Sequence, residues 1–78
     1  MIIRHDYKTI IFKSFEKNIR LIPINISEIQ FGYGFNFNID ELNNNVSILK
    51  LGDLFNMKIN NLPNNLLELY TGVNLIKI

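Results

Sequence analysis

The sequence has no cysteine, no tryptophan and no alanine, and its only histidine is His5. Without cysteine the chain cannot form disulfides or a cysteine-based zinc site, which are common ways of stabilising so short a domain. A single histidine also removes most of the remaining ligand sets for zinc. The lack of alanine in a chain so rich in isoleucine argues against long helices.

Charge and long hydrophobic runs are scarce as well. The net charge is +1, from eight basic and seven acidic residues, and no basic block stands out. We therefore expect no nucleic-acid partner and no membrane partner. Residues 1–6 lack the apolar core of a signal peptide, and apolar runs such as 21–24 are far too short to span a bilayer. The sequence predicts a soluble protein of the cytoplasm.

Isoleucine and asparagine dominate what is present. The chain has 14 isoleucines and 13 asparagines. One explanation is codon bias in an AT-rich genome. The other is structural, because isoleucine fits a pleated, half-buried surface and asparagine satisfies bent backbone and tolerates left-handed conformations.

The glycines reveal an internal period. Three of the four, Gly32, Gly52 and Gly72, are 20 residues apart, and other residue types recur in the same frame. The recurring columns are Ile22, Leu42 and Leu62; Asn25, Asn45 and Asn65; Ile26, Val46 and Leu66; Ile29, Leu49 and Leu69; and Phe35, Phe55 and Leu75. A fixed period of this kind predicts a repeat architecture. The expected units of this single domain (1–78) are repeats at 22–41 and 42–61 and a truncated repeat at 62–78.

The first 21 residues fit this frame less well, and two interpretations stay open. In one, they form a degenerate repeat or cap, with Ile11 in the column of Phe31 and a phenylalanine in place of the glycine. Terminal repeats are often atypical because they cap the stack. In the other, residues 13–20 form a short helix in which Phe15 and Ile19 share a face.

An alternating pattern precedes each glycine. Positions two apart on a strand share a face, so we expect Ile29 and Phe31 to point inward. The predicted strands are 27–31, 47–51 and 68–71. Each ends at a glycine, because the turn there requires a positive φ or the close approach of another backbone. The predicted fold class is mainly β: a short β-solenoid with parallel strands, one per 20-residue repeat.

After each glycine, the chain must return to the start of the next strand. The predicted inward residues of these return paths are Phe35, Ile39 and Leu42, then Phe55, Ile59 and Leu62. Asn36 and Asn56 follow the two phenylalanines. Because an amide side chain both donates and accepts, we predict that these asparagines form a hydrogen-bonded column between repeats. The alternative is exposed turn asparagines with no such column.

Two copies of a longer motif lie in phase. The first is Ile22-Pro23, Ile26, Ile29-Gln30-Phe31-Gly32 and Phe35-Asn36-Phe37-Asn38-Ile39; the second is Val46, Leu49-Lys50-Leu51-Gly52 and Phe55-Asn56-Met57-Lys58-Ile59. A third, incomplete copy is Leu62-Pro63, Leu66, Leu69 and Gly72. This pattern resembles the FNIP repeat, a relative of leucine-rich repeats.

The resemblance implies a leucine-rich-repeat-like fold. Such repeats are typical of social amoebae and of giant viruses that infect amoebae, so it also implies such a source and, for a viral protein, the host cytoplasm. Many members carry an amino-terminal F-box, which implies substrate recognition for ubiquitin ligation. This chain departs from the pattern in its period of 20 rather than 22, and we expect no F-box to fit before Ile22.

Recognisable catalytic chemistry is absent from the sequence. His5 has no evident nucleophile partner, and the seven carboxylates are scattered. Residues 32–34 resemble a phosphate-binding loop only faintly, since they open no helix and precede no lysine. Tyr33 and Phe37 suggest stacking on bases, but no basic groove accompanies them. We expect no enzyme, no cofactor and no metal site.

The outward strand positions provide the candidate site. The expected columns on that face are Lys8, Glu28, Ile48 and Glu68, and Ile10, Gln30, Lys50 and Tyr70. Mixed polar and apolar side chains on a regular sheet are what repeat proteins use to bind partners. We therefore expect a protein–protein interaction module with an unknown protein partner. The alternatives are a structural or vestigial fragment of a longer repeat protein and, with less support, a substrate-recognition part of a ubiquitin-ligase system.

The last repeat strand, 68–71, has no successor in this frame. Leu75 takes the phenylalanine column, which would place it on Phe55. An unpaired strand edge is a template for association. We therefore expect self-association through this carboxyl-terminal edge, or a need for a partner or further repeats there.

Overall fold

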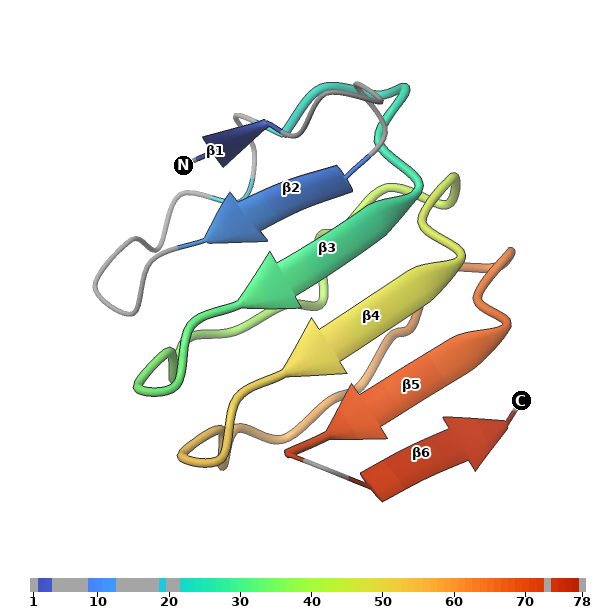
Figure 1. The fold of residues 1–78 in the computed structure, drawn as a ribbon. Coiled ribbons are helices and arrows are strands. Elements are labelled where there is room, and N and C mark those ends of the chain that lie inside the picture. Colours follow the sequence, from blue (N-terminus) through green and yellow to red (C-terminus); the bar gives the residue numbers. More distant parts are fainter. Residues whose placement is uncertain (1, 4–8, 13–18, 20–21, 73, 78) are drawn as a thin grey trace.

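The computed structural model describes residues 2–3, 9–12, 19, 22–72 and 74–77. They form one six-stranded sheet in the order of the sequence (Figure 1). Its strands are β1 (Ile2–Ile3), β2 (Thr9–Phe12), β3 (Glu28–Phe31), β4 (Ile48–Leu51), β5 (Glu68–Thr71) and β6 (Asn74–Lys77). Strands β2 to β5 run parallel, and β1 and β6 pair antiparallel at the two edges. No helix among the described residues is long and apolar enough to cross a membrane.

The 20-residue period of the sequence sets the register in which β3, β4 and β5 pair. Ile29 pairs with Leu49, and Leu49 pairs with Leu69, so the columns read from the sequence are the columns of the parallel ladder. The three strands predicted before the glycines are confirmed within one residue at each end. The fold is therefore mainly β, with four parallel strands in one sheet.

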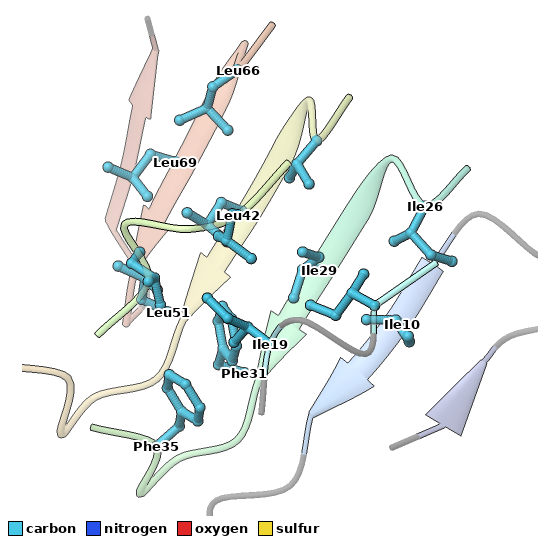
Figure 2. Close-up of a cluster of buried hydrophobic side chains, with 14 residues drawn as sticks. Ile10, Ile19, Ile26, Ile29, Phe31, Phe35, Leu42, Leu51, Leu66 and Leu69 are labelled. Atoms are coloured by element: carbon cyan, nitrogen blue, oxygen red, sulfur yellow. The ribbon is translucent and has the colours of Figure 1, made fainter. Parts of the chain in front are cut away.

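The segments between β3 and β4 and between β4 and β5 return on one side of the sheet, and the hydrophobic core lies between the two layers (Figures 1 and 2). We call residues 32–47 the inner coil and residues 52–67 the outer coil. Ile29 and Leu49 are fully buried, as the alternation predicts, and Phe35 and Ile39 of the inner coil meet them from the other layer. All fourteen buried hydrophobic residues among those described belong to this one cluster.

Tight turns fold the inner coil back onto the sheet. The backbone N–H of Phe35 donates to the carbonyl of Gly32 at 3.1 Å, and the N–H of Leu42 donates to the carbonyl of Ile39 at 3.2 Å. Each turn brings its last residue into the core, where the Phe35 ring stacks on the Phe31 ring with centroids 4.1 Å apart. The return path is thus held by local turns and by burial of the residues that end them.

The glycine positions serve two different purposes. Gly72 has a φ of +63°, the left-handed conformation that the turn argument requires. At Gly52 the reason is close approach: a Cβ there would overlap the carbonyl oxygen of Gly32 and lie 2.9 Å from the Cα and the carbonyl oxygen of Tyr33. The repeats pack so closely at this corner that a side chain on Gly52 would meet the backbone of the preceding repeat.

The first repeat is one residue shorter than expected. Ile10 pairs with Ile29, 19 residues along, and it is fully buried. The expected match of Ile11 with Phe31 is therefore wrong, because Ile11 lies opposite Gln30. Ile19 still matches Ile39, since each accepts a backbone hydrogen bond from the residue three positions later. The missing residue thus falls between Ile10 and Ile19, while the alternative helix over 13–20 lies almost wholly outside the described residues.

The carboxyl-terminal edge is also arranged differently from the expectation. The chain reverses after Gly72, and β6 pairs antiparallel with β5 along four residue pairs, from Thr71↔Asn74 to Glu68↔Lys77. The expectation that β5 has no successor is wrong. So is the place given to Leu75, which lies opposite Tyr70 rather than on a further return path. Because β6 pairs with β5, β6 rather than β5 is the edge strand at this end, and self-association through the carboxyl-terminal edge stays a prediction.

Candidate protein-binding face

The outward side of β3, β4 and β5 brings together all six side chains predicted for the site. The ladder pairs Glu28 with Ile48 and Ile48 with Glu68, and it pairs Gln30 with Lys50 and Lys50 with Tyr70. All six are half-buried, whereas their strand neighbours Ile29, Leu49 and Leu69 are buried. We call these six residues the sheet face: Glu28, Gln30, Ile48, Lys50, Glu68 and Tyr70.

One half of the sheet face is organised around Glu28. Its Oε2 atom accepts a hydrogen bond from Nε2 of Gln30 at 2.9 Å and lies 3.3 Å from Nζ of Lys50. The side chain of Lys50 is 40% exposed and that of Glu28 is 21% exposed, so water still screens the pair. An ion pair of this kind contributes at most about 1 kcal/mol. Its main effect is to hold the two charged groups in one arrangement.

The other half is organised around Tyr70. Its hydroxyl donates to Oε1 of Glu68 at 3.2 Å, and Nζ of Lys50 lies 5.3 Å from the centre of its ring. A cation over an aromatic ring is attracted by the ring quadrupole. Lys50 therefore links Glu28 on one side to Tyr70 on the other, and the contacts span all three strands.

Charge and hydrophobic surface alternate on the sheet face. Ile48 stands between the two glutamates in its column, and Ile11 adds a half-buried aliphatic side chain beside Gln30. The six residues of the sheet face include two carboxylates and one ammonium. Such a surface can accept hydrogen bonds from basic groups while an apolar side chain packs on the isoleucines and on the Tyr70 ring.

One residue expected on this face, Ile10, is not part of it. Ile10 belongs to the core, and Ile11 takes the outward position because the register of β2 is shifted by one residue. A one-residue shift moves every side chain of a strand to the opposite face. Lys8 lies outside the described residues. Three consecutive apolar residues, 10–12, give no alternation from which the correct register could have been read.

A second set of polar contacts joins the inner and outer coils. The predicted asparagine column is confirmed: Oδ1 of Asn36 accepts a hydrogen bond from the backbone N–H of Asn56 at 2.7 Å. The same contact recurs where Oδ1 of Asn44 accepts from the N–H of Asn64 at 3.0 Å. Asn36 and Asn56 are exposed, so the column runs along the surface rather than through a buried corner.

Asp40 makes the equivalent contact, and its acceptor is a charged carboxylate rather than an amide. The sequence did not lead us to predict this contact. Its Oδ1 accepts from the backbone N–H groups of Asn60 and Asn61 at 2.8 and 3.1 Å. The N–H of Asn60 is the main cause that lowers the pKa of the Asp40 carboxyl, against a smaller opposing effect of partial burial. The signal was present in the sequence, because Asp40 and Asn60 are one period apart.

Hydrogen bonds, one ion pair and one cation–ring contact order the side chains of these two surfaces. No group of three or more His, Asp or Glu side chains within the described part of the chain is placed to hold a metal ion. The ordered features are the sheet face and the coil-to-coil hydrogen bonds. Comparison with protein-family models, with curated proteins and with solved structures found no match in any of the three.

Proposed function

We propose that this chain is a protein–protein interaction module, built as a short leucine-rich-repeat-like β-solenoid, and that the sheet face is its binding surface. The observation that carries the proposal is the network centred on Lys50, which holds side chains from three consecutive repeats in one arrangement. Side chains that are ordered before binding lose less conformational entropy when a partner docks. We assign no catalytic role and no cofactor to this face.

The resemblance to FNIP repeats gives the proposal its architecture. The motif residues Phe35 and Phe55 stack across one period with parallel rings, at 6.5 Å between centroids and 4° between planes. The asparagines that follow them are hydrogen-bonded to each other. Both contacts are what a stacking repeat requires, since a single repeat cannot bury its own hydrophobic face. These contacts support an FNIP-like repeat, and the resemblance alone is the ground on which we propose a place in the cytoplasm, that of the host for a viral protein.

The chemistry of the sheet face favours a partner with basic and apolar side chains. Glu28 offers a partly exposed carboxylate that can accept a hydrogen bond from a basic group of a partner. Ile48 and the Tyr70 ring provide the apolar contact, and tyrosine is enriched where binding energy concentrates. A partner surface that carries arginine or lysine beside an aliphatic side chain meets these requirements.

The experiment is capture of partners from amoebal lysate with the full chain and two double variants. Lys50→Ala with Tyr70→Ala removes the centre of the network. Tyr33→Ala with Lys58→Ala removes the same two residue types from exposed positions away from the sheet face. Circular dichroism melting must show that both variants remain folded.

We expect a partner that the unmodified chain and the Tyr33/Lys58 variant retain and that the Lys50/Tyr70 variant loses. Its affinity should fall as salt concentration rises, because part of the attraction is between charges. A partner held equally by all three proteins would contradict the assignment of the sheet face. So would an affinity that is indifferent to salt.

A further inference from the structure

The outer coil has the same kinds of surface residues as the inner coil. The inner coil is covered by the outer coil, but no described coil covers the outer coil. Phe35 is fully buried and Ile39 is 1% exposed, because residues of the outer coil pack on them. The corresponding residues of the outer coil, Phe55 and Ile59, are only half-buried. Within the described part of the chain, no further coil lies over them.

The hydrogen-bond acceptors show the same difference. Side-chain oxygens of the inner coil accept backbone N–H groups of the outer coil, 20 residues along: Asn36 from Asn56, Asp40 from Asn60 and Asn44 from Asn64. The equivalent acceptors of the outer coil are the side chains of Asn56, Asn60 and Asn64. No donor among the described residues reaches the Oδ1 atoms of Asn56 and Asn64, while Asn60 uses its Nδ2 group to bond back to Asp40.

Exposed hydrophobic side chains gather on the same segment. Five large hydrophobic residues among those described are exposed, and three of them, Leu54, Met57 and Leu67, belong to the outer coil. β6 does not relieve this exposure by its pairing, which is with β5. β5 is thus paired on both sides, whereas no described coil covers the outer coil.

We propose that this open surface docks an extended segment of a second protein. We call it the coil face, and its residues are Phe55, Asn56, Ile59, Asn60, Leu62 and Asn64. The coil face presents the same kinds of residues that the inner coil presents to the outer coil. We therefore infer the features of its occupant from those of the outer coil. The segment carries apolar side chains at positions i, i+4 and i+7, as Phe55, Ile59 and Leu62 do, and presents free backbone N–H groups at i+1, i+5 and i+9.

A folded second copy does not meet the requirement for free donors. The backbone N–H groups of Asn56, Asn60 and Asn64 already bond to the inner coil of their own chain. The described outer coil of another copy therefore has none to offer at these positions. A strand that adds to this end of the sheet would pair with β6, the edge strand, and would leave the acceptors of the coil face unused. The occupant is an unpaired extended segment of about ten residues, matched to the span of the motif.

The test uses the full chain and a fluorescent synthetic peptide with the sequence of residues 53–66, which carries the required spacing. We expect saturable one-to-one binding by fluorescence anisotropy. The double variant Asn56→Ala with Asn64→Ala removes two acceptors but leaves the backbone of the outer coil intact, and binding should weaken about tenfold or more. A peptide N-methylated at the residues matching Asn56 and Asn60 loses the donors and should weaken similarly.

Asn65→Ala is the matched control. Asn65 is an exposed asparagine of the same coil, but its counterpart Asn45 reaches back to the carbonyl of Ile24 rather than forward to the next coil. Affinity for the peptide should therefore not change. The Lys50→Ala with Tyr70→Ala variant should also bind the peptide normally, so failure of the coil face and failure of the sheet face can be told apart.

Three results would overturn the proposal. The first is no saturable binding at millimolar peptide. The second is affinity that is unchanged by the Asn56/Asn64 double variant and by N-methylation of the peptide. The third is a dimer, seen by sedimentation of the chain without peptide, that the same double variant abolishes, because a second copy would then be the occupant of the coil face.

Discussion

Gly52 and Gly72 occupy the same column of the repeat, yet the structure gives them different sensitivities to substitution. A Cβ on Gly52 meets backbone atoms of Gly32 and Tyr33, which cannot rotate away. Relief requires the two repeats to separate locally, and overpacking of this kind costs about 1–3 kcal/mol. The branched side chain of Gly52→Val should cost at least about 3 kcal/mol by the same mechanism.

At Gly72 the cost has another origin. Its left-handed φ penalises an ordinary L-residue by about 1–2 kcal/mol. The new Cβ would lie 2.7 Å from Oδ1 of Asp53, a side-chain atom that can move. Asparagine adopts the left-handed region more readily than alanine. We therefore expect Gly72→Asn to recover part of the loss caused by Gly72→Ala, and Gly52→Asn to recover none of the loss at Gly52.

Urea unfolding followed by circular dichroism measures these differences. A 78-residue domain has a total stability of roughly 4–12 kcal/mol, so a loss of about 2–3 kcal/mol shifts the midpoint clearly. The slope should stay constant if only the native state is affected. Equal losses for Gly52→Ala and Gly72→Ala, with asparagine behaving alike at both positions, would refute the distinction between close approach and backbone conformation. A Gly52→Val midpoint equal to that of the unmodified chain would refute the packing argument altogether.

Three other predictions follow from the core and the coil contacts. Leu49 is fully buried, so Leu49→Ala should lower the free energy of unfolding by about 2–5 kcal/mol, while Lys50→Ala should lower it by less than about 1 kcal/mol; equal losses in urea would mean that the strand faces are misassigned. Asn36→Ala removes the acceptor of the Asn56 N–H, and because water can replace it we expect a loss of only about 0.5–1.5 kcal/mol. Hydrogen exchange at the Asn56 amide should become faster, and an unchanged rate would contradict the contact. The folded-state pKa of Asp40 is lowered, so its contribution to stability is present above the unfolded pKa near 4 and is lost as pH falls through the folded value. Asp40→Asn should flatten the loss of stability measured between about pH 5 and about pH 2, and an identical acid profile would remove Asp40 from that role.

The sequence predicts those parts of the fold that depend on local pattern repeated in phase. The glycine period and the alternation of residues such as Leu49 and Lys50 are enough to place β3, β4 and β5 and to separate core from sheet face. In β2 the same reasoning fails because Ile10, Ile11 and Phe12 are all apolar, so the pattern does not distinguish the two faces. The register is decided instead by burial of Ile10 against the neighbouring strand.

The sequence after Gly72 is compatible with two different structures. In the repeat frame, Leu75 continues a return path; in a hairpin, it pairs with Tyr70. Only two residues separate β5 from β6, and the first is Gly72 with a positive φ, a recognised hairpin signal. The repeat frame predicts a return path here, whereas the hairpin signal predicts the reversal that the structure has. A return path without a following strand buries little, whereas the hairpin pairs the whole of β5.

The sheet has an antiparallel strand at each end, β1 and β6, and parallel repeats between them. This architecture does not fix how many parallel repeats lie between the two ends. The described hydrogen bonds between the inner and outer coils join residues 20 or 21 positions apart, as Asn36 is joined to Asn56 and Asp40 to Asn61, and none depends on how many periods lie beyond. Gain or loss of one 20-residue unit between β3 and β5 would keep every remaining pairing in register and leave both terminal hairpins as they are. In such a chain, length can change by whole units without redesign of either end, and each new unit would add one more row to the sheet face.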